Sequence, residues 1–387
     1  MSTAAARADS GTTGGTGGTA RADGGTTGSA GSADGGTTGS AAAHVLVVGA
    51  GVTGLLTAVA CARAGHRVTV LERGPLPNPD ATSHDQHRAL RTLLPGDPDG
   101  TARRLAAHRH WEELETLLGT ALYRRVGVLT AHPADRLDEL LAAAGRAGVP
   151  VDLPAPVDLP PLGLPPGTVG VRERTGGVLL ADRVLRAAVR WLTARPGVAL
   201  RPHSTVRSVF TGSGRIVLDT GEVLRGDLAL LAGGPWTRRL ADSPVTLYRQ
   251  TMLYLGRPAG GDRWDTAPTA GGLGREGRGW VLPPGAGTLL KLSSDTVCRP
   301  VADTDSGGED QRPYLDRLAA EGVLPDLERY PVAGVRVCHY TADAATGGPL
   351  LARVSPGLWT RAACGGSGFS TAPLVAERIA EAVREAA

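Results

Sequence analysis

The chain has 387 residues, of which 41% are hydrophobic, 4% are aromatic and 20% are charged. This length and hydrophobic content allow a large buried core divided between about two domains. The formal net charge is only +3, no basic block argues for nucleic acid, and no apolar run approaches the roughly 20 residues of a membrane-spanning helix.

The N-terminal segment, residues 1–42, differs from the rest of the chain in composition. It is rich in glycine, threonine, serine and alanine, with imperfect repeats such as GTTGGTGGTA and ADGGTTGSA. Such a segment has little apolar surface to bury, so we expect residues 1–42 to form a disordered tail. A secretory signal peptide would need a basic start and an apolar centre, which this segment lacks. The four scattered cysteines fit neither a disulfide framework nor a zinc site, which favours a reducing, cytoplasmic setting and no bound metal.

Ordered structure is expected to begin with a β-α-β unit of about thirty residues. His44–Val48 is a short apolar run rich in β-branched residues, which is typical of a buried parallel strand. Leu55–Ala64 follows as a helix that Gly65 would end, and Arg67–Leu71 is a second strand. The turn between the first strand and the helix has the spacing G-x-G-x-x-G.

That turn, together with the acidic residue that ends the second strand, predicts a dinucleotide-binding site. Gly49 permits the tight turn, Gly51 allows close approach of a pyrophosphate, and Gly54 lets the helix pack on the strand. The free N–H groups and the positive dipole end at the helix start suit phosphate. Glu72 would accept hydrogen bonds from an adenosine ribose, which favours FAD or NAD over NADP. The alternative is an ordinary strand and glycine turn, but the surrounding pattern makes the nucleotide site the preferred interpretation.

The rest of the sequence predicts a mixture of helices and strands. Helices are expected at Thr101–Leu118, at Ala134–Ala147, from a capping Asp182 to Thr193, and from Pro373 onward. Strands are expected at Tyr123–Thr130, Thr246–Leu255, Leu289–Leu292 and Leu358–Ala363, with a β-meander over Val206–Leu231 and a proline-rich loop or edge over Val151–Pro166.

Two later glycine turns favour FAD over NAD. The chain returns to the nucleotide domain at Ala232-Gly233-Gly234 and again at Gly365-Gly366-Ser367-Gly368, whereas an NAD fold normally continues directly into further β-α units. We therefore predict an α/β protein with a Rossmann-like FAD-binding domain and a second, mixed or antiparallel β-sheet substrate domain. The discontinuous FAD-binding domain is expected at 43–121, 170–240 and 345–387, and the substrate domain at 122–169 and 241–344.

Five segments carry a resemblance to a known family: VVGAGVTGLLTAVACARAGHRVTVLERG from Val47, SHDQHRALR from Ser83, Gly176-Gly177-Val178, Ala232–Trp236, and RVCHYT from Arg336. The sequence resembles the D-amino-acid-oxidase-type flavoproteins, and within them the monomeric sarcosine oxidase and glycine oxidase group. The resemblance runs from about Val45 to the C-terminus and is patchy between about 95 and 170. It implies FAD-dependent oxidation of a small amine to an imine, with O₂ as electron acceptor and H₂O₂ as the second product.

The resemblance also implies which residues surround the flavin. The expected cofactor contacts are Gly49, Gly51, Val52, Thr53, Gly54, Glu72, Arg73, Arg88, Val206, Ala232, Gly233, Trp236, Gly366, Gly368 and Phe369. Arg88 and Arg91 match an arginine pair near the flavin ring, where they would act on flavin or substrate; the alternative is a charged helix face. His84 and His87 in the same segment are further catalytic candidates.

The segment Arg336–Thr341 is the most specific part of the resemblance. In the sarcosine oxidase group an R-V-C-x-Y-T segment carries the cysteine that bonds covalently to the flavin, and here that position is Cys338. This chemistry needs a partly exposed sulfur beside cations that lower its pKa, and Arg336 could supply such a charge. The alternative is a buried structural cysteine. The other three cysteines are predicted to be structural: Cys61, Cys298 and Cys364.

Lys291 is the only lysine among 41 basic residues, and it lies in the apolar run Thr288–Leu292. In the family that the sequence resembles, a lysine at this place beside the flavin assists the reaction with O₂. Electron transfer to O₂ makes superoxide, and a fixed ammonium would stabilise that anion by about 3 kcal/mol. The alternative is a solvated edge lysine. It is disfavoured because every other basic position is arginine, and an ammonium is the more compact charge.

Two departures from the family limit the substrate prediction. Sarcosine oxidases carry a lysine for the substrate carboxylate at the position of Ser370, which leaves Arg91 as the remaining carboxylate ligand. They also carry a histidine where this chain has Ser293-Ser294-Asp295, and Asp295 would attract a substrate ammonium. We therefore expect a small-molecule amine other than sarcosine, such as an intermediate of specialised metabolism.

Two other functions stay open at the level of sequence. An NAD(P)H-dependent aromatic hydroxylase on a related fold usually carries a late Gly-Asp turn, whereas this chain has Ala363-Cys364-Gly365-Gly366. A flavin-holding subunit of a larger complex would not need the ammonium of Lys291 for direct O₂ chemistry. Peroxide production without a partner would separate an oxidase from such a subunit. We expect a monomer or a homodimer.

Overall fold

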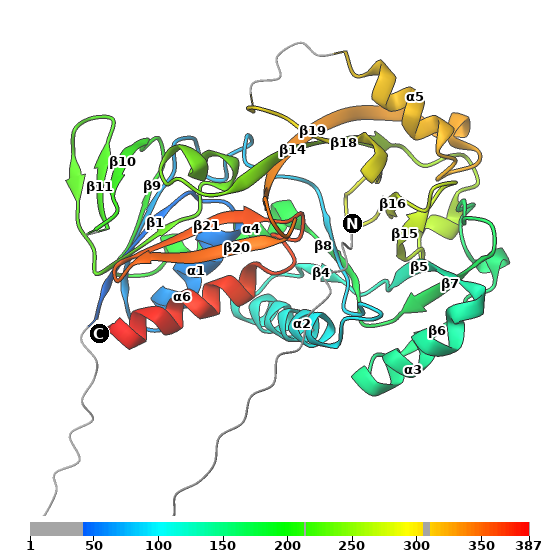
Figure 1. Cartoon of the computed structure of the whole chain (residues 1–387), viewed down its shortest axis with the longest axis horizontal. Coiled ribbons are helices and arrows are strands. Elements are labelled where there is room, and N and C mark those ends of the chain that lie inside the picture. Colours follow the sequence, from blue (N-terminus) through cyan, green and yellow to red (C-terminus); the bar gives the residue numbers. More distant parts are fainter. Residues whose placement is uncertain (1–41, 213, 305–309, 387) are drawn as a thin grey trace, which may run out of the picture.

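The computed structural model describes residues 42–212, 214–304 and 310–386 (Figure 1). The tail expected at 1–42 therefore lies outside the described residues, apart from its last position. None of the described helices is both long enough and apolar enough to span a membrane.

A six-stranded sheet forms one half of the molecule (Figure 1). Its order is β20-β21-β13-β1-β2-β9, and all neighbouring pairs are parallel except β20 with β21. Its strands are β1 (His44–Val48), β2 (Arg67–Leu71), β9 (Val198–Arg201), β13 (Leu228–Leu231), β20 (Pro349–Ser355) and β21 (Leu358–Cys364). The first two strands have the predicted bounds, because glycine turns delimit their apolar, β-branched runs.

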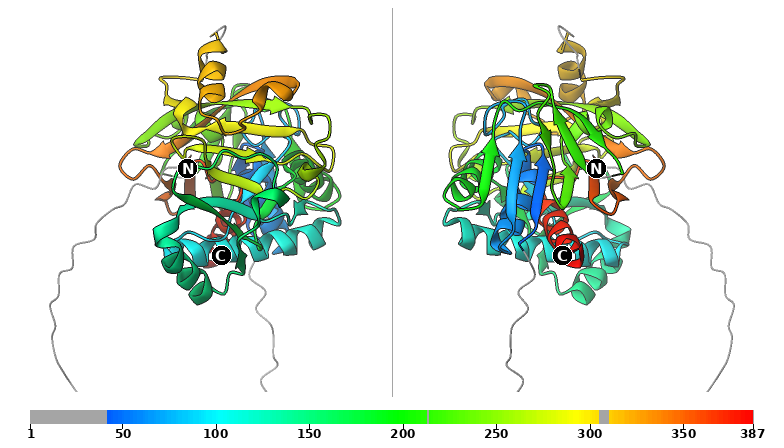
Figure 2. Two further views of the ribbon diagram at one scale, coloured as in Figure 1. Left: turned by 90° about the vertical axis from the view of Figure 1, so that its right-hand side faces the viewer. Right: turned by 90° about the vertical axis from the view of Figure 1, so that its left-hand side faces the viewer.

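Side chains alternate between the two faces along each strand of this sheet, and other elements of the fold cover both faces. Val45 and Val47 of β1 face a core that includes four helices. Leu46 and Val48 face the opposite core, which a small antiparallel sheet covers. The helices are α1 (Val52–Arg63), α2 (Pro98–Leu118), α4 (Ala181–Thr193) and α6 (Ala372–Ala386), and the small sheet is β10 (Val206–Phe210), β11 (Arg215–Leu218) and β12 (Val223–Leu224). Helices α1 and α6 lie side by side although they come from opposite ends of the sequence (Figure 2).

A nine-stranded, mostly antiparallel sheet forms the other half (Figure 1). Its order is β18-β14-β17-β16-β15-β5-β7-β6, and β19 pairs along β14. The strands are β5 (Val128–Pro133), β6 (Val151–Asp152), β7 (Thr168–Glu173), β14 (Val245–Leu255), β15 (Thr269–Leu273), β16 (Gly279–Leu282), β17 (Leu290–Ser294), β18 (Cys298–Pro300) and β19 (Val332–Asp343). The fold class predicted from the sequence is confirmed, whereas the exact domain boundaries stay a prediction.

Smaller elements complete the second half. Helix α5 (Arg312–Ala320) packs on the core of the nine-stranded sheet through Leu318, and α3 (Leu137–Ala147) packs against β7 through Leu140 and Ala144. A three-stranded sheet of order β3-β8-β4 contains β3 (Arg88–Leu90), β4 (Tyr123–Arg124) and β8 (Gly177–Leu179).

Three predictions differ from the structure by more than a shift of about three residues at an element's end. The strand expected at Tyr123–Thr130 is divided into β4 and β5, because Gly127 has a φ of +79° that interrupts the extended backbone. Asp182 does not cap α4: the helix begins at Ala181, and the Asp182 carboxylate accepts a hydrogen bond from Arg186 Nε at 2.9 Å. The meander contains only β10, β11 and β12, because β13 pairs with β1 in the parallel sheet.

Candidate active site

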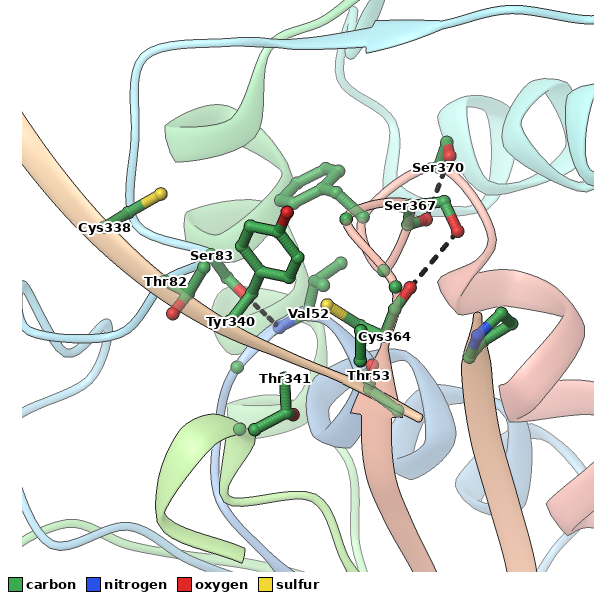
Figure 3. A pocket seen from close by; sticks show the side chains of 18 of the residues that line it. Val52, Thr53, Thr82, Ser83, Cys338, Tyr340, Thr341, Cys364, Ser367 and Ser370 are labelled. Atoms are coloured by element: carbon green, nitrogen blue, oxygen red, sulfur yellow. Dashed lines mark hydrogen bonds between the residues drawn. The ribbon is translucent and has the colours of Figure 1, made fainter. Parts of the chain in front are cut away.

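A cavity of about 1480 Å³ is lined by residues of both large sheets. One part lies at the carboxyl end of β1, beside Gly49, and another reaches Trp280 on β16 and Lys291 on β17. A crevice outside the carboxyl ends of parallel strands is where open α/β sheets bind ligands. Figure 3 shows part of the wall, where Cys338 and Tyr340 project from the same side of β19.

The glycine turn after β1 suits a diphosphate group. Gly49 has a φ of +100°, and a Cβ there would lie 2.6 Å from the carbonyl oxygen of Ala232. A Cβ on Gly51 would lie 3.1 Å from Ser83 Oγ, which accepts a hydrogen bond from Val52 N at 3.0 Å (Figure 3). Apart from the neutral Ser83 hydroxyl at Val52 N, helix α1 begins here with no side-chain cap from its N-cap Gly51 and no acidic residue in its first turn. Its N-terminus is therefore open to an anion.

Glu72, at the end of β2, is buried and holds the adjacent loops in place. Its carboxylate accepts hydrogen bonds from Ala50 N at 2.8 Å, Gly74 N at 3.1 Å and Asn78 Nδ2 at 2.9 Å. Glu72 also lines the cavity, and a carboxylate with about four lone-pair sites can still accept a ribose hydroxyl. The same residue thus fixes the glycine turn and faces the nucleotide end of the cavity.

All the residues predicted to contact the cofactor line this cavity, except Gly54. Gly54 faces the turn instead, since a Cβ there would lie 1.9 Å from the carbonyl oxygen of Gly49. This placement agrees with the packing role expected for the third glycine of the motif. At the same end, the guanidinium of Arg73 stacks 3.7 Å from the ring centroid of Trp236.

Lys291 lines the cavity although it is only 2% exposed. Its Nζ donates hydrogen bonds to Asp85 Oδ2 at 2.5 Å and to the backbone oxygen of His87 at 3.4 Å. Asp85 also pairs with Arg88 and accepts a hydrogen bond from the hydroxyl of Tyr254 at 2.5 Å. Burial, and next the guanidinium of Arg88, lower the pKa of Lys291 well below its ordinary value. The amino group of Lys291 lies between the cavity and a buried carboxylate.

Cys338 on β19 lines the cavity and is partly exposed. Burial raises the pKa of its thiol, although Arg88, Lys291 and Arg336 act in the opposite direction. The cationic surroundings expected from the sequence are present, and two of the three cations were not foreseen as neighbours of the thiol. They do not outweigh burial, so the thiol form is favoured at neutral pH.

The other cysteines correct a prediction. Cys61 is buried in the core around α1, as a structural cysteine should be. Cys298 and Cys364, however, are partly exposed and line the cavity (Figure 3). The sulfur of Cys298 lies 3.3 Å from the hydroxyl of Tyr340. The sequence did not predict that Cys298 and Cys364 line the cavity, because β18, β19 and the end of β21 meet only in the folded molecule.

Two arginines at the cavity wall have no carboxylate within salt-bridge distance among the described residues. They are Arg91, which follows β3, and Arg104 on α2, and both are partly buried. The charge of Glu173 favours the protonated form of both arginines and so raises their pKa. Its carboxylate, however, accepts hydrogen bonds from Thr92 N at 2.8 Å and from Leu93 N. Burial and the guanidinium of Arg91 lower the pKa of Arg104 to about 10. This part of the cavity suits an anionic group.

The two other predicted substrate residues both line the cavity. Asp295 begins the 3₁₀ turn η5 (Asp295–Val297) after β17. Ser370 follows the last glycine turn, and its Oγ donates a hydrogen bond to the backbone oxygen of Ser367 at 3.0 Å (Figure 3). The Ser370 hydroxyl is therefore engaged within the turn and carries no charge for a substrate carboxylate.

The two histidine candidates have different surroundings. His84 is not among the described residues that line the cavity, and its Nε2 lies 3.8 Å from Asp182 Oδ1. This placement does not support the catalytic role expected for His84, because its imidazole faces the start of α4. His87 is fully buried beside Lys291, and burial followed by that cation lowers the pKa of His87 to about 3. His87 is therefore neutral at physiological pH.

Comparison with known proteins identifies the family. Residues 44–382 match the family model described as FAD dependent oxidoreductase. The chain belongs to the FAD-dependent oxidoreductase family. In this family member, the N-terminus of α1 would hold the FAD pyrophosphate, Glu72 the adenosine ribose, and the part of the cavity beside Lys291 and Cys338 the flavin. The positive N-terminal end of helix α1, the remaining acceptor capacity of the Glu72 carboxylate and the size of the cavity all fit that cofactor.

Three similar proteins illustrate the range of relatives. Peroxisomal sarcosine oxidase of Mus musculus is 30% identical over 220 residues, which cover 54% of this chain and 56% of that protein. The bifunctional tRNA 5-methylaminomethyl-2-thiouridine biosynthesis protein MnmC of Chromohalobacter salexigens is 28% identical over 394 residues, covering 88% of this chain and 53% of that protein. The chain spans about half the length of these curated relatives. The structure of NikD, an unusual amino acid oxidase essential for nikkomycin biosynthesis, matches with a TM-score of 0.72 at 20% identity, covering 89% of this chain and 94% of NikD.

Sequence reasoning missed three residues of this site: Asp85, Arg104 and Tyr254. Asp85 lies within the segment from Ser83 that the resemblance had already marked, and this was the only available signal for it. Arg104 is one of several arginines on α2, so nothing in its own segment distinguishes it from a surface cation. Tyr254 is one of several aromatic or apolar residues of β14, and its partner comes from a distant loop.

Proposed function

We propose that this FAD-dependent oxidoreductase is an oxidase of a small amine or amino acid. The substrate loses two electrons and two protons across a C–N bond and becomes an imine, and O₂ takes up the same electrons and protons to become H₂O₂. FAD, when bound, supplies the ring that accepts and passes on the electrons. The observation that carries the proposal is Lys291, the only lysine of the chain, buried at the cavity wall.

The surroundings of Lys291 suit a reaction with O₂. Its Nζ is fixed by Asp85 and by the backbone oxygen of His87, so its charge needs no rearrangement when superoxide forms. Preorganised charge of this kind is typically worth about 3 kcal/mol. A guanidinium would spread its charge over a plane, whereas an ammonium concentrates it. This contrast gives a reason for a single lysine in a chain that otherwise uses arginine.

We further propose that the substrate carries an acidic group bound by Arg91 and Arg104. Both guanidiniums line the cavity, and neither has a salt-bridge partner among the described residues. Ser370 offers no charge at the position where sarcosine oxidases carry a lysine. Arg104 on α2 would supply the second positive charge for the substrate's acidic group instead. Asp295, on the same cavity, would favour entry of a cationic amine. These differences support a substrate other than sarcosine, although the relatives include sarcosine oxidases and an amino acid oxidase.

We also propose that Cys338 bonds covalently to the flavin. Its thiol is partly exposed to the cavity and lies near Arg88, Lys291 and Arg336, which favour the thiolate that such a bond requires. Cys298 and Cys364 line the same cavity, so they serve as internal comparisons for the assignment.

The oxidase proposal can be tested before a substrate is known. The flavin of the purified enzyme is reduced by light without oxygen, mixed with O₂, and followed by its absorbance, with peroxide measured at the end. Lys291→Met is expected to slow reoxidation by about a hundredfold, because it removes the fixed ammonium. Lys291→Arg keeps a positive charge and is expected to recover only part of the rate.

Wild-type enzyme that reoxidises no faster than Lys291→Met would contradict the oxidase proposal. It would favour a flavin-holding subunit that passes electrons to a partner. A panel of amines with and without a second acidic group, each assayed for peroxide, then defines the substrate. Activity confined to amines without any acidic group would contradict the role proposed for Arg91 and Arg104.

A further inference from the structure

Asp85 occupies a buried position directly behind Lys291. It is 3% exposed, and of the described residues Lys291 lines the cavity whereas Asp85 does not. Its carboxylate accepts hydrogen bonds from Lys291 Nζ at 2.5 Å, from the hydroxyl of Tyr254 at 2.5 Å and from Gln86 N at 2.6 Å, and it pairs with Arg88. Four donors directed at one carboxylate favour its charged form and restrain its orientation behind the lysine.

The other charged groups near Lys291 are positive. Arg88 comes from the loop and strand that also carry Asp85, and Arg336 comes from β19. Burial and both guanidiniums lower the pKa of Lys291. Asp85 is the single carboxylate within 4 Å of Lys291 Nζ in the part of the chain that the structure describes. Without it, a buried ammonium beside two cations would lose its proton readily.

The remaining groups that face Lys291 are uncharged near neutral pH. Burial and Lys291 itself lower the pKa of His87 to about 3, and burial raises the pKa of Tyr254 to about 12. Burial also raises the pKa of the Cys338 thiol. The rings of Tyr254 on β14 and Trp280 on β16 lie 5.7 and 5.8 Å from the ammonium, which is the outer limit of a cation–π contact. None of these groups replaces a carboxylate.

We propose that Asp85 is a positioning residue that keeps Lys291 protonated and fixed at the cavity wall. This inference rests on the proposed oxidase function, since it names the group that keeps the oxygen-directed ammonium charged. Lys291 Nζ has three protons, and among the described residues two acceptors are present, Asp85 Oδ2 and the His87 backbone oxygen. The third proton is left for the cavity side, where the charge is needed.

The test uses the fact that Lys291 is the only lysine of the chain. Holoenzyme grown with ¹³C,¹⁵N-labelled lysine gives one lysine side-chain signal, whose chemical shift reports protonation during a pH titration. The wild-type signal is expected to stay at the ammonium position through about pH 7. In Asp85→Asn the titration is expected to move down by at least about one pH unit, a tenfold loss in proton affinity.

Reoxidation of the photoreduced enzyme by O₂ provides the second readout. The rate for Asp85→Asn is expected to fall as pH rises through the lysine titration and to approach the rate of Lys291→Met. Asp85→Glu, which keeps the charge, is expected to restore most of the wild-type pH profile. Asp182→Asn removes a carboxylate that pairs with Arg186 at the surface of α4 and is expected to leave the lysine signal unchanged.

Each outcome has a distinct meaning. An unchanged lysine titration in Asp85→Asn, or an uncharged lysine in the wild-type holoenzyme at about pH 7, would overturn the inference. The wild-type spectrum decides the second point even if Asp85→Asn does not fold. If instead Lys291→Met reoxidises as fast as wild type, the oxidase proposal fails, whereas the NMR titration still reports whether Asp85 controls the lysine.

Discussion

Burial and charge act in opposite directions on the thiol of Cys338. Three cations favour its thiolate, yet burial raises its pKa. Below that pKa, each unit of pH raises the thiolate population about tenfold, and the thiolate is the nucleophile. Covalent attachment after FAD is added to apoprotein is therefore expected to become faster as pH rises. The measurement is the flavin absorbance that stays in the acid-precipitated protein, sampled over time at several pH values.

The matched variants identify the attachment site. Cys338→Ser is expected to release all flavin into the supernatant on acid precipitation. Cys364→Ser changes a second thiol of the same cavity and is expected to retain the flavin in the pellet. A yellow pellet from Cys338→Ser would place the bond on another residue.

The residues of the site that the sequence revealed are those marked by local spacing or by composition. The glycine turn can be recognised from the residues next to it in the sequence, and Lys291 can be recognised because it is the only lysine. Asp85 was not predicted because its role depends on its contact with Lys291, which lies 206 residues away in the sequence. No local pattern can show that a carboxylate in a loop will lie behind one particular strand. The position of His84 was not foreseen for the same reason, since the sequence did not show that its ring lies beside Asp182.

At the scale of elements, the contact between α1 and the glycine turn sets where the nucleotide lies. A Cβ at position 54 would be 1.9 Å from the carbonyl oxygen of Gly49, so Gly54→Ala must push α1 away from β1. We expect at least about a tenfold loss of FAD affinity, because the helix N-terminus would no longer meet the phosphates. The measurement is FAD titration of apoprotein by fluorescence.

The control is a helical glycine with open space around it. Gly145 of α3 would place a Cβ with no heavy atom within 4 Å. Gly145→Ala is expected to leave FAD affinity unchanged and to stabilise the protein by about 0.5–1 kcal/mol, since alanine is the better helix former. Equal loss of FAD binding in both variants would contradict the packing explanation.

Helix α2 brings Arg104 to the same part of the cavity as Arg91. Arg104→Gln is expected to weaken binding of small carboxylates by about tenfold or more, because it removes one charged hydrogen-bond donor. The flavin absorbance spectrum reports their binding. Arg103, the preceding residue, is exposed on the same helix, and Arg103→Gln is expected to have no such effect. Equal weakening in the two variants would indicate a general charge effect in place of a specific site.

The elements that could be predicted are those with strong local signals. The runs His44–Val48 and Arg67–Leu71 gave the bounds of β1 and β2, because each apolar run stops at a glycine-containing segment. The break between β4 and β5 was missed, since the positive φ of Gly127 depends on the different sheets that the two strands join. Sheet membership is a long-range property, and a periodic pattern does not specify it.

At the scale of the whole molecule, the cavity is lined by both large sheets. It is lined by β1 and the turn after β21 on one side and by β14, β16, β17 and β19 on the other. A ligand that fills it contacts both halves at once. Its binding energy is therefore expected to stabilise the molecule as a unit, since it is lost if either half unfolds.

Thermal unfolding with increasing FAD tests this coupling. Cys338→Ser is the suitable background, because the proposed covalent bond would otherwise prevent reversible binding. At a free FAD concentration about a hundredfold above Kd, linkage predicts a stabilisation of about 2.7 kcal/mol. Calorimetry is expected to show one transition that moves upward as a whole, and a movement of only about 1.4 kcal/mol at the same FAD concentration when Gly54→Ala weakens binding about tenfold. Two transitions, of which FAD moves only one, would show that the sheets unfold independently and that the cavity does not couple them.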